Sequence, residues 1–160
     1  MAKKSIQKHR SGCPVSVSLD IFGDRWSLVI VRDLMVRGYR TFGEFLNAGE
    51  GIATNILADR LHKLEAAGIL TAEPMADDGR SINYRLTAKG IDLAPVLLEL
   101  LIWAARNEDT AAPCSYIAQM EQNREALLAE VYRRWERRDP TPLIPPFNSP
   151  AKSSKARTPR

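Results

Sequence analysis

The pattern of apolar and polar residues predicts two helices in the first part of the chain, although the apolar run of the first has strand-like spacing: Val15, Val17, Leu19, Ile21 and Phe22. Pro14 suits the first turn of a helix, where a missing backbone N–H is harmless, and Gly23 marks the end of that helix. A second helix is expected over 25–37, with Asp24 as its N-cap. Its apolar residues fall on one face, three, four and eight positions after the first: Trp26, Val29, Ile30 and Leu34.

Two further helices are predicted before residue 68. Thr41 and Glu44 have the spacing of a capping box, in which each side chain accepts a hydrogen bond from the other residue's backbone N–H. This pattern predicts a short helix, followed by a glycine-rich turn. Thr54 is then expected to cap a longer helix that ends at Gly68. The leucines of this helix recur at helical spacing: Leu57, Leu61 and Leu64.

The pattern then changes from helical spacing to that of strands. Residues 69–74 and 82–86 are predicted to form two short strands, and the polar segment 75–81 joins them as a hairpin. Two long helices are expected beyond the hairpin, from Thr87 to about Arg106 and over 115–138. The first of them is apolar nearly all round, which is typical of a helix buried in a large core or by a partner.

Composition adds most at the two ends. The chain has 160 residues, of which 44% are hydrophobic and 26% charged, as in one globular domain with tails. Its net charge of +4 comes from the ends, because the part between them is acidic overall. We expect residues 1–11 to be a disordered basic arm and residues 139–160, rich in proline, to be a disordered basic tail. Net charge is therefore a weak argument for nucleic-acid binding.

The sequence also argues against several classes of protein. Its longest apolar run, 93–105, is too short for a bilayer, and the N-terminus lacks the apolar part of a secretory signal. We therefore expect no membrane association and a cytoplasmic location. Cys13 and Cys114 cannot form a disulfide framework. The two histidines are too far apart for a metal site, and no phosphate-binding glycine loop occurs, so neither a cofactor nor an enzyme is predicted.

Three helices followed by a two-stranded hairpin form a winged helix-turn-helix, in which one helix enters the DNA major groove. The predicted fold is mainly α, with a small β-hairpin wing. In helix 54–67 the leucines face the core and leave polar residues outward. With arginines near helix starts and at the hairpin tip, these residues make up the predicted DNA-binding set: Arg25, Arg40, Thr54, Asn55, Asp59, Arg60, His62, Lys63 and Arg80.

These side chains have different expected contacts with DNA. Asn55 can bond adenine bidentately, Arg60 and Lys63 can reach phosphates or guanine, and Arg80 can probe the minor groove or its phosphates. Asp59 would repel phosphate. Since any exposed helix face is polar, the pattern alone leaves two functions open: DNA binding and a winged-helix module for protein interaction.

Several motifs of the chain, spread over about residues 13–104, resemble the HxlR family of bacterial regulators, relatives of the MarR group. The motifs are Cys13-Pro14-Val15, Gly23-Asp-Arg-Trp26 with the residues up to Leu34, Arg40-Thr-Phe42-Gly-Glu44-Phe, Ile52-Ala-Thr-Asn-Ile-Leu57, Leu61-His-Lys-Leu-Glu65-Ala-Ala-Gly68 and Tyr84-Arg-Leu86-Thr-Ala-Lys-Gly90. The resemblance implies a dimeric winged-helix transcription factor that binds double-stranded DNA. It also implies that helix 54–67 is the recognition helix, that 69–86 is the wing, and that the first helix and those after the wing form the dimer interface.

This resemblance divides the chain into an HxlR-type domain over 12–106 and a helical extension over 107–138. The extension is expected to enlarge the dimer interface or to build part of a ligand pocket. A homodimer predicts a pseudo-palindromic operator, and repression is the family default. The family often has Ser then Lys where Thr54 and Asn55 stand, so the operator sequence cannot be transferred. Three aromatic residues are expected in the dimer interface: Trp103, Tyr132 and Trp135.

Cys13 has two interpretations. Some HxlR-like regulators use a cysteine at this position to sense oxidants or reactive electrophiles, and a helix N-terminus stabilises a thiolate. Alternatively the residue is structural, since a cysteine before this helix is common in family members that have no known sensing role. The effector, an oxidant or a small molecule, stays open, and Cys114 is expected to have no role.

Overall fold

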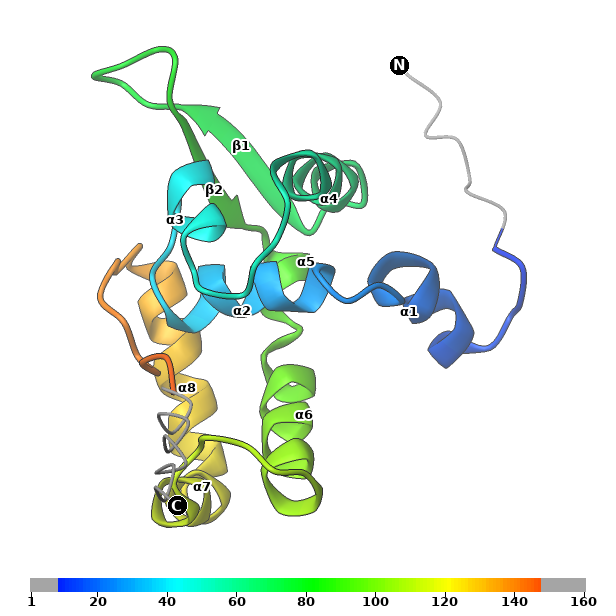
Figure 1. The fold of residues 1–160 in the computed structure, drawn as a ribbon, viewed down its shortest axis with the longest axis vertical. Coiled ribbons are helices and arrows are strands. Elements are labelled where there is room, and N and C mark those ends of the chain that lie inside the picture. The colour runs from blue at the N-terminus through cyan, green and yellow to red at the C-terminus, as the bar shows by residue number, and fades with distance from the viewer. Residues whose placement is uncertain (1–8, 148–160) are drawn as a thin grey trace, which may run out of the picture.

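The computed structural model describes residues 9–147, which form helices and one two-stranded antiparallel sheet (Figure 1). The first part of the chain contains α1 (Pro14–Phe22), α2 (Ser27–Val36), α3 (Phe42–Leu46) and α4 (Thr54–Ala66). The hairpin consists of β1 (Leu70–Pro74) and β2 (Ile82–Leu86). The helices α5 (Ala88–Ile91), α6 (Ala94–Asn107), α7 (Cys114–Gln122) and α8 (Arg124–Glu136) follow. The order is that of the predicted winged helix-turn-helix, mainly α with a small β-hairpin wing.

The helix α2 is the central support of the fold. It contacts α4 and β2 on one side and α6 and α8 on the other. In Figure 1, α3, α4 and the hairpin lie on one side of α2, while α6, α7 and α8 extend from the opposite side. The predicted leucine stripe of α4 is confirmed as core, since all three of its residues are buried: Leu57, Leu61 and Leu64.

The helix ends follow the predicted signals at most positions. The capping box of α3 is confirmed, because the Glu44 backbone N–H donates to the Thr41 hydroxyl and the Thr41 N–H donates to the Glu44 carboxylate. Gly68 ends the next helix with a positive φ of 72°. The prediction that Thr54 caps α4 is wrong. Ala53 is the N-cap residue and makes no side-chain cap, while Thr54 already has helical geometry.

Both long helices predicted after the hairpin are broken in two. Thr87 caps only the short α5, which ends at Ile91. Pro95 explains the break, because proline has no N–H to donate to the Ile91 carbonyl and its ring would clash there. The second break lies at Asn123, which leaves helical geometry between α7 and α8. The breaks let α6 and α8 lie side by side beneath α2, with α7 across their far ends (Figure 1).

Residues 139–147, which we call the strap, run back along the protein to α2. The backbone N–H groups of Leu143 and Ile144 both donate to the Val36 carbonyl, at 2.7 and 3.1 Å, and Ile144 is buried. The prediction of disorder is therefore wrong for the strap, because its apolar residues pack against α2 and α6. The rest of the predicted tails, residues 1–8 and 148–160, lies outside the described residues. In the described part of the N-terminal arm, His9 Nδ1 lies 3.1 Å from a carboxylate oxygen of Asp20.

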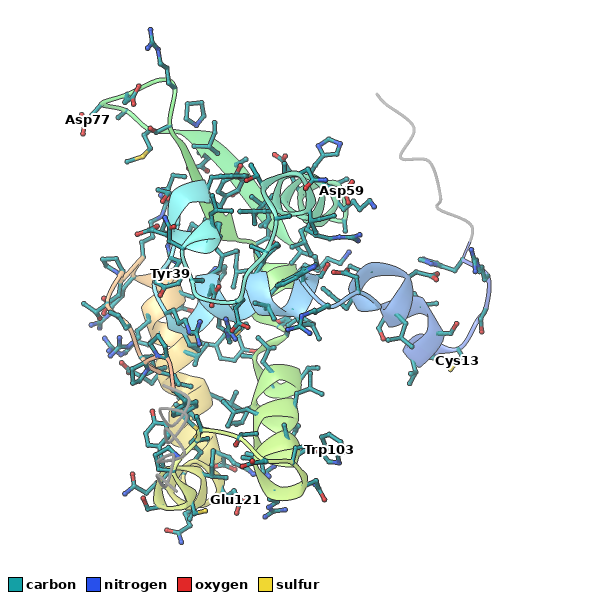
Figure 2. All side chains as sticks on the ribbon, in the orientation of Figure 1. Cys13, Tyr39, Asp59, Asp77, Trp103 and Glu121 are labelled. Carbon is teal, nitrogen blue, oxygen red and sulfur yellow. The ribbon has the colours of Figure 1, made fainter. Side chains whose placement is uncertain are left out.

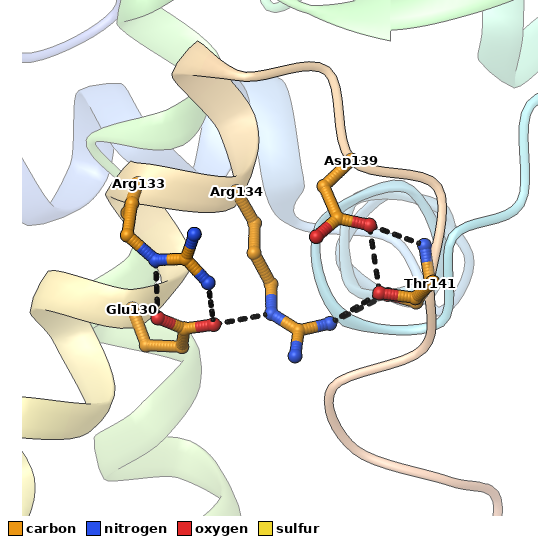
Figure 3. A network of polar contacts seen from close by, with 5 residues as sticks. All are labelled: Glu130, Arg133, Arg134, Asp139 and Thr141. Atoms are coloured by element: carbon orange, nitrogen blue, oxygen red, sulfur yellow. Dashed lines mark hydrogen bonds and ion pairs between the residues drawn. The ribbon is translucent and has the colours of Figure 1, made fainter.

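A polar network holds the start of the strap against α8 (Figure 3). Glu130 accepts hydrogen bonds from Arg133 and Arg134, which lower the pKa of Glu130 to about 2. Arg134 also donates to the carbonyl and the hydroxyl of Thr141, at 2.9 and 2.8 Å. Asp139 accepts hydrogen bonds from the backbone N–H and the hydroxyl of the same threonine. The network therefore fixes where the chain leaves α8.

Trp135 joins α8 to the base of the wing. Its indole N–H donates to the Leu86 carbonyl at 2.8 Å, and the Arg85 guanidinium lies over its ring and donates to its carbonyl. Tyr132 also packs against the main core. Both side chains thus pack within the protomer while staying partly exposed, and their place in a dimer interface stays a prediction. Trp103, by contrast, is exposed.

Candidate nucleic-acid interface

The outer face of α4 is polar and exposed. Its described residues include five of the predicted DNA-binding residues: Thr54, Asn55, Asp59, His62 and Lys63. Figure 2 shows Asp59 on the side of α4 that points away from the core. Because the opposite side of the helix packs into the core, this face is fixed in direction and can be presented to a groove of DNA.

The N-terminal end of α4 has the properties of a DNA contact. Thr54 and Asn55 are exposed in its first turn. Since Ala53 supplies no side-chain cap, the N–H groups of this turn can meet a phosphate oxygen. This end of the helix therefore combines N–H donors for the DNA backbone with the Asn55 side-chain amide, which can form hydrogen bonds with a base edge.

Charges on the outer face of α4 are partly paired with one another. Lys63 Nζ lies 3.0 Å from a carboxylate oxygen of Asp59, and Arg60 Nε lies 3.6 Å from the same oxygen. Asp59 is therefore placed to hold two cationic side chains rather than to contact an anionic backbone. Lys63, whose pair with Asp59 is exposed, can exchange this carboxylate for a phosphate at little loss, because surface ion pairs contribute about 0–1 kcal/mol.

Arg60 is held more firmly than the sequence suggests. Its Nη1 lies 3.4 Å from Asp24, and its Nε is buried without a hydrogen-bond acceptor among the described residues. Asp24 also accepts hydrogen bonds from the backbone N–H groups of Trp26 and Ser27, at 2.8 and 3.0 Å. Burial opposes ionisation of Asp24, but these hydrogen bonds and the charge of Arg60 outweigh it and lower its pKa. The Asp24–Arg60 contact thus fixes α4 against the start of α2.

Arg40 points into the protein. One guanidinium nitrogen donates to the carbonyls of Leu34 and Tyr39, at 2.7 Å each. Burial lowers the pKa of Arg40, Glu44 acts against this, and the charge of Arg85 adds to it. Arg40 is thus only partly exposed and one of its nitrogens holds carbonyls at the end of α2, so its contact with DNA stays a prediction outside the exposed set.

The wing tip is exposed and has a defined shape. Arg80 is exposed, as predicted, and its backbone N–H donates to the Asp78 carboxylate at 3.0 Å. The Ser81 hydroxyl donates to the same carboxylate, and the Met75 N–H donates to the Ser81 carbonyl. Asp78 therefore orders the tip, a role that we did not predict. Its signal was the Asp-Gly-Arg-Ser sequence, which is typical of an Asx turn.

The structure brings part of the predicted set together. The wing and α4 lie on the same side of α2 (Figure 1). Arg25 is exposed just before α2, with its guanidinium 5.2 Å from the Trp26 ring centre. Arg40 and Arg60 are only partly exposed, because each interacts with other groups of the fold. The exposed candidates that remain are Arg25, Thr54, Asn55, Asp59, His62, Lys63 and Arg80.

Cys13 is exposed at the N-cap position of α1, at the opposite end of that helix from α2 (Figure 2). The backbone N–H groups of Ser16 and Val15, in the first turn of α1, lower the pKa of its thiol. A lower pKa increases the thiolate fraction, which is the reactive form. The position is therefore suited to reaction with an oxidant or electrophile.

Residues 9–147 contain neither a cluster of metal ligands nor a helix that could span a membrane. No three His, Cys, Asp or Glu side chains in this range lie together as metal ligands would. None of the helices described there is both long and apolar enough to cross a membrane.

Comparison with known proteins identifies the family. The HxlR-like helix-turn-helix family matches residues 21–112, so α7, α8 and the strap follow the matched part. YybR of Bacillus subtilis, named an uncharacterized HTH-type transcriptional regulator, is 33% identical over 107 residues, 67% of this chain and 85% of YybR. The redox regulator HypR in its oxidised form is 31% identical with a TM-score of 0.55, over 61% of this chain and 100% of HypR. The reduced transcriptional regulator YodB from B. subtilis is 30% identical with a TM-score of 0.51, over 61% and 95% of the two chains. This chain therefore belongs to the HxlR-like helix-turn-helix family of transcriptional regulators.

Proposed function

We propose that this protein is a cytoplasmic, sequence-specific DNA-binding repressor and not an enzyme. The observation that carries the proposal is the exposed polar face of α4, on the same side of the molecule as the wing tip. In this proposal Thr54 and Asn55 contact base edges in the major groove. Arg25, Lys63 and Arg80 contact the DNA backbone, with Arg80 at or beside the minor groove.

The proposed repressor acts as a homodimer. Helices α1 and α6 expose large apolar side chains, which are unfavourable in water and mark an interaction surface. We call this surface the α1–α6 patch: Val15, Leu19, Val96, Leu100 and Trp103. Two-fold symmetry through it would place two α4 helices on half-sites about 34–36 Å apart, or a multiple of this distance, in a pseudo-palindromic operator.

Substitutions on α4 and on the wing are expected to affect DNA binding differently. Asn55→Ala should reduce the preference for operator over random DNA by about tenfold, because it removes a base contact. Arg80→Ala should weaken binding to both DNAs alike and make the salt dependence shallower, because it removes a phosphate contact. Fluorescence anisotropy with DNA flanking the protein's own gene, at two salt concentrations, measures both effects.

Two variants on the α7–α8 side serve as controls. Gln119→Ala removes an exposed amide from α7, and Arg137→Ala removes an exposed guanidinium from the end of α8. Both variants should bind DNA like the parent. If Asn55→Ala and Arg80→Ala also bind like the parent, the proposed DNA-contacting surface is wrong. Equally weak binding of the parent to every DNA, lost with salt, would favour the second candidate, a winged-helix module for protein interaction.

We also propose that oxidation of Cys13 weakens operator binding. This proposal is supported by the exposed thiol with its lowered pKa. It is also supported by the relatives, since HypR is named a redox regulator and one structure of YodB contains a bound quinone. The thiolate would attack one oxygen of hydrogen peroxide and break the O–O bond, giving a sulfenic acid and a hydroxide that takes a proton from solvent to become water.

The redox proposal predicts a response that depends on one of the two cysteines. Peroxide should lower the operator affinity of the parent and of Cys114→Ser by about tenfold or more, while Cys13→Ser keeps its affinity. Anisotropy before and after peroxide, with reversal by a thiol reductant, measures this response. An equal loss of operator affinity in Cys13→Ser, or no loss in the parent, would contradict the redox proposal. Cys13 would then have only a structural role.

A further inference from the structure

A cavity of about 460 Å³ lies beneath α2, between α6, α8 and the strap. Its wall is almost entirely apolar, with side chains such as Val29, Leu97 and Leu101 on the side of α2 and α6. Its volume falls within the range of about 300–1,000 Å³ that small-molecule sites occupy. The cavity lies on the opposite side of α2 from the proposed DNA interface.

The segments that close this cavity follow the part of the chain that matches the family. Leu127 of α8 and Ile144 and Phe147 of the strap line it, while the family match ends at residue 112. The strap is held in place by its two hydrogen bonds to the Val36 carbonyl. The site is therefore a feature of this chain's extension and not of the winged unit alone.

Arg37 gives the apolar cavity a strong hydrogen-bond donor. It lines the cavity, and its side chain is only 10% exposed. Its Nη1 donates to the buried Asp33 at 3.1 Å, and this is its one side-chain hydrogen bond within residues 9–147. A guanidinium has five N–H donors, so Arg37 retains donors for a ligand.

A second arginine, Arg32, reaches the same wall but has fewer donors to spare. Its guanidinium donates to Asp33 at 2.8 and 3.0 Å and to Glu50 at 2.9 Å. Neither Asp33 nor Glu50 lines the cavity, and no other acid does. Among residues 9–147, the only charged side chains that line the cavity are therefore these two arginines.

We propose that this cavity binds an apolar molecule that carries one carboxylate, with the carboxylate on Arg37 and the apolar body between α6, α8 and the strap. A planar guanidinium matches the geometry of a carboxylate, and charge-assisted hydrogen bonds of this kind are about twice as strong as neutral ones. A two-ring aromatic acid or a medium-chain fatty acid has a suitable size. Residues 148–160, which follow Phe147, are mostly polar or basic and do not match an apolar site.

Occupancy of the cavity is proposed to regulate DNA binding, and this second step rests on the function proposed above. Val29 lines the cavity, and α2 also contacts α4 and β2. A ligand that shifts α2 would therefore shift the outer face of α4 relative to the wing. The binding step itself needs no DNA and can be tested alone.

The test uses the full chain without DNA and follows binding of 2-naphthoate by isothermal titration calorimetry. We expect saturable binding, and at least tenfold weaker binding of the matched alcohol, 2-naphthalenemethanol, which cannot form the charge-assisted pair. Arg37→Gln should abolish this preference for the acid. Ala104→Leu, which fills part of the cavity, should weaken both ligands about tenfold, while Ala126→Leu on the exposed side of α8 should change neither.

Several results would overturn the binding proposal. These are no saturable binding of 2-naphthoate, equal binding of acid and alcohol, or full affinity in a folded Ala104→Leu. Binding that occurs only after Leu19→Asp separates the protomers would show that a second copy fills the cavity. The regulatory step is tested by operator anisotropy with 2-naphthoate present, where an unchanged affinity would overturn it. Failure of the protein to bind any operator would instead contradict the proposed function and leave the calorimetric result intact.

Discussion

Gly38→Ala is expected to lower the free energy of unfolding by about 3 kcal/mol. The backbone of Gly38 has a positive φ of 76°, a conformation that costs other residues roughly 1–2 kcal/mol. A β-carbon there would lie 2.0 Å from the Pro140 carbonyl oxygen, so the strap would have to move away. Moving it breaks the two hydrogen bonds to Val36, each of which contributes about 1 kcal/mol. Urea denaturation followed by circular dichroism measures the change.

Gly49→Ala separates the two causes of this loss. Gly49 also has a positive φ, 85°, but a β-carbon there would meet no atom within 4 Å. We therefore expect only the backbone part of the effect, about 1 kcal/mol. Equal losses in the two variants would show that the strap does not pack closely on Gly38.

Leu19→Asp is expected to convert the proposed dimer into a monomer and to lower operator affinity at least a hundredfold. Leu19 is 58% exposed in the protomer, so the fold itself should be little affected. In a dimer joined through the α1–α6 patch, the new carboxylate would be buried without a partner, which costs several kcal/mol. A monomer also loses the gain from binding two half-sites at once. Light scattering after size exclusion gives the mass, and anisotropy gives the affinity.

The control for this variant is Ala118→Asp, which adds the same charge at an exposed position on α7. It should remain dimeric and bind the operator like the parent. A dimeric Leu19→Asp protein would place the interface elsewhere. A monomeric variant with full operator affinity would show instead that one protomer suffices for recognition.

The sequence was most informative where the signal is local. The Thr41–Glu44 capping box, the Gly68 helix end and the two strands of the hairpin are each signalled by residues only a few positions apart, and all three predictions are confirmed. Apolar spacing alone did not show the helix breaks, because the pattern continues across Pro95 and Asn123. The proline was a signal that could have predicted the first break.

The candidate site was harder to predict because its side chains have partners far along the chain or within the backbone. Arg40 looks like a free cation near a helix start, yet the carbonyls of Leu34 and Tyr39 hold it. Arg60 lies on the polar side of its helix, yet it pairs with Asp24, more than thirty positions earlier. Such partners depend on the folded chain, so periodicity can identify an exposed face but not which of its cations are free.

The strap also bears on the order in which the protein folds and opens. Leu143 and Ile144 pair with Val36, about one hundred positions away in the sequence, whereas the helices and the hairpin form from nearby residues. Contacts of such long range close a large loop and are expected late in folding. The strap rests on two backbone hydrogen bonds, a few apolar side chains and the polar network at its start, so it can detach by local unfolding while the core stays intact. The amides of Leu143 and Ile144 would then exchange with solvent faster than those of α4, and each opening would admit or release a molecule in the cavity.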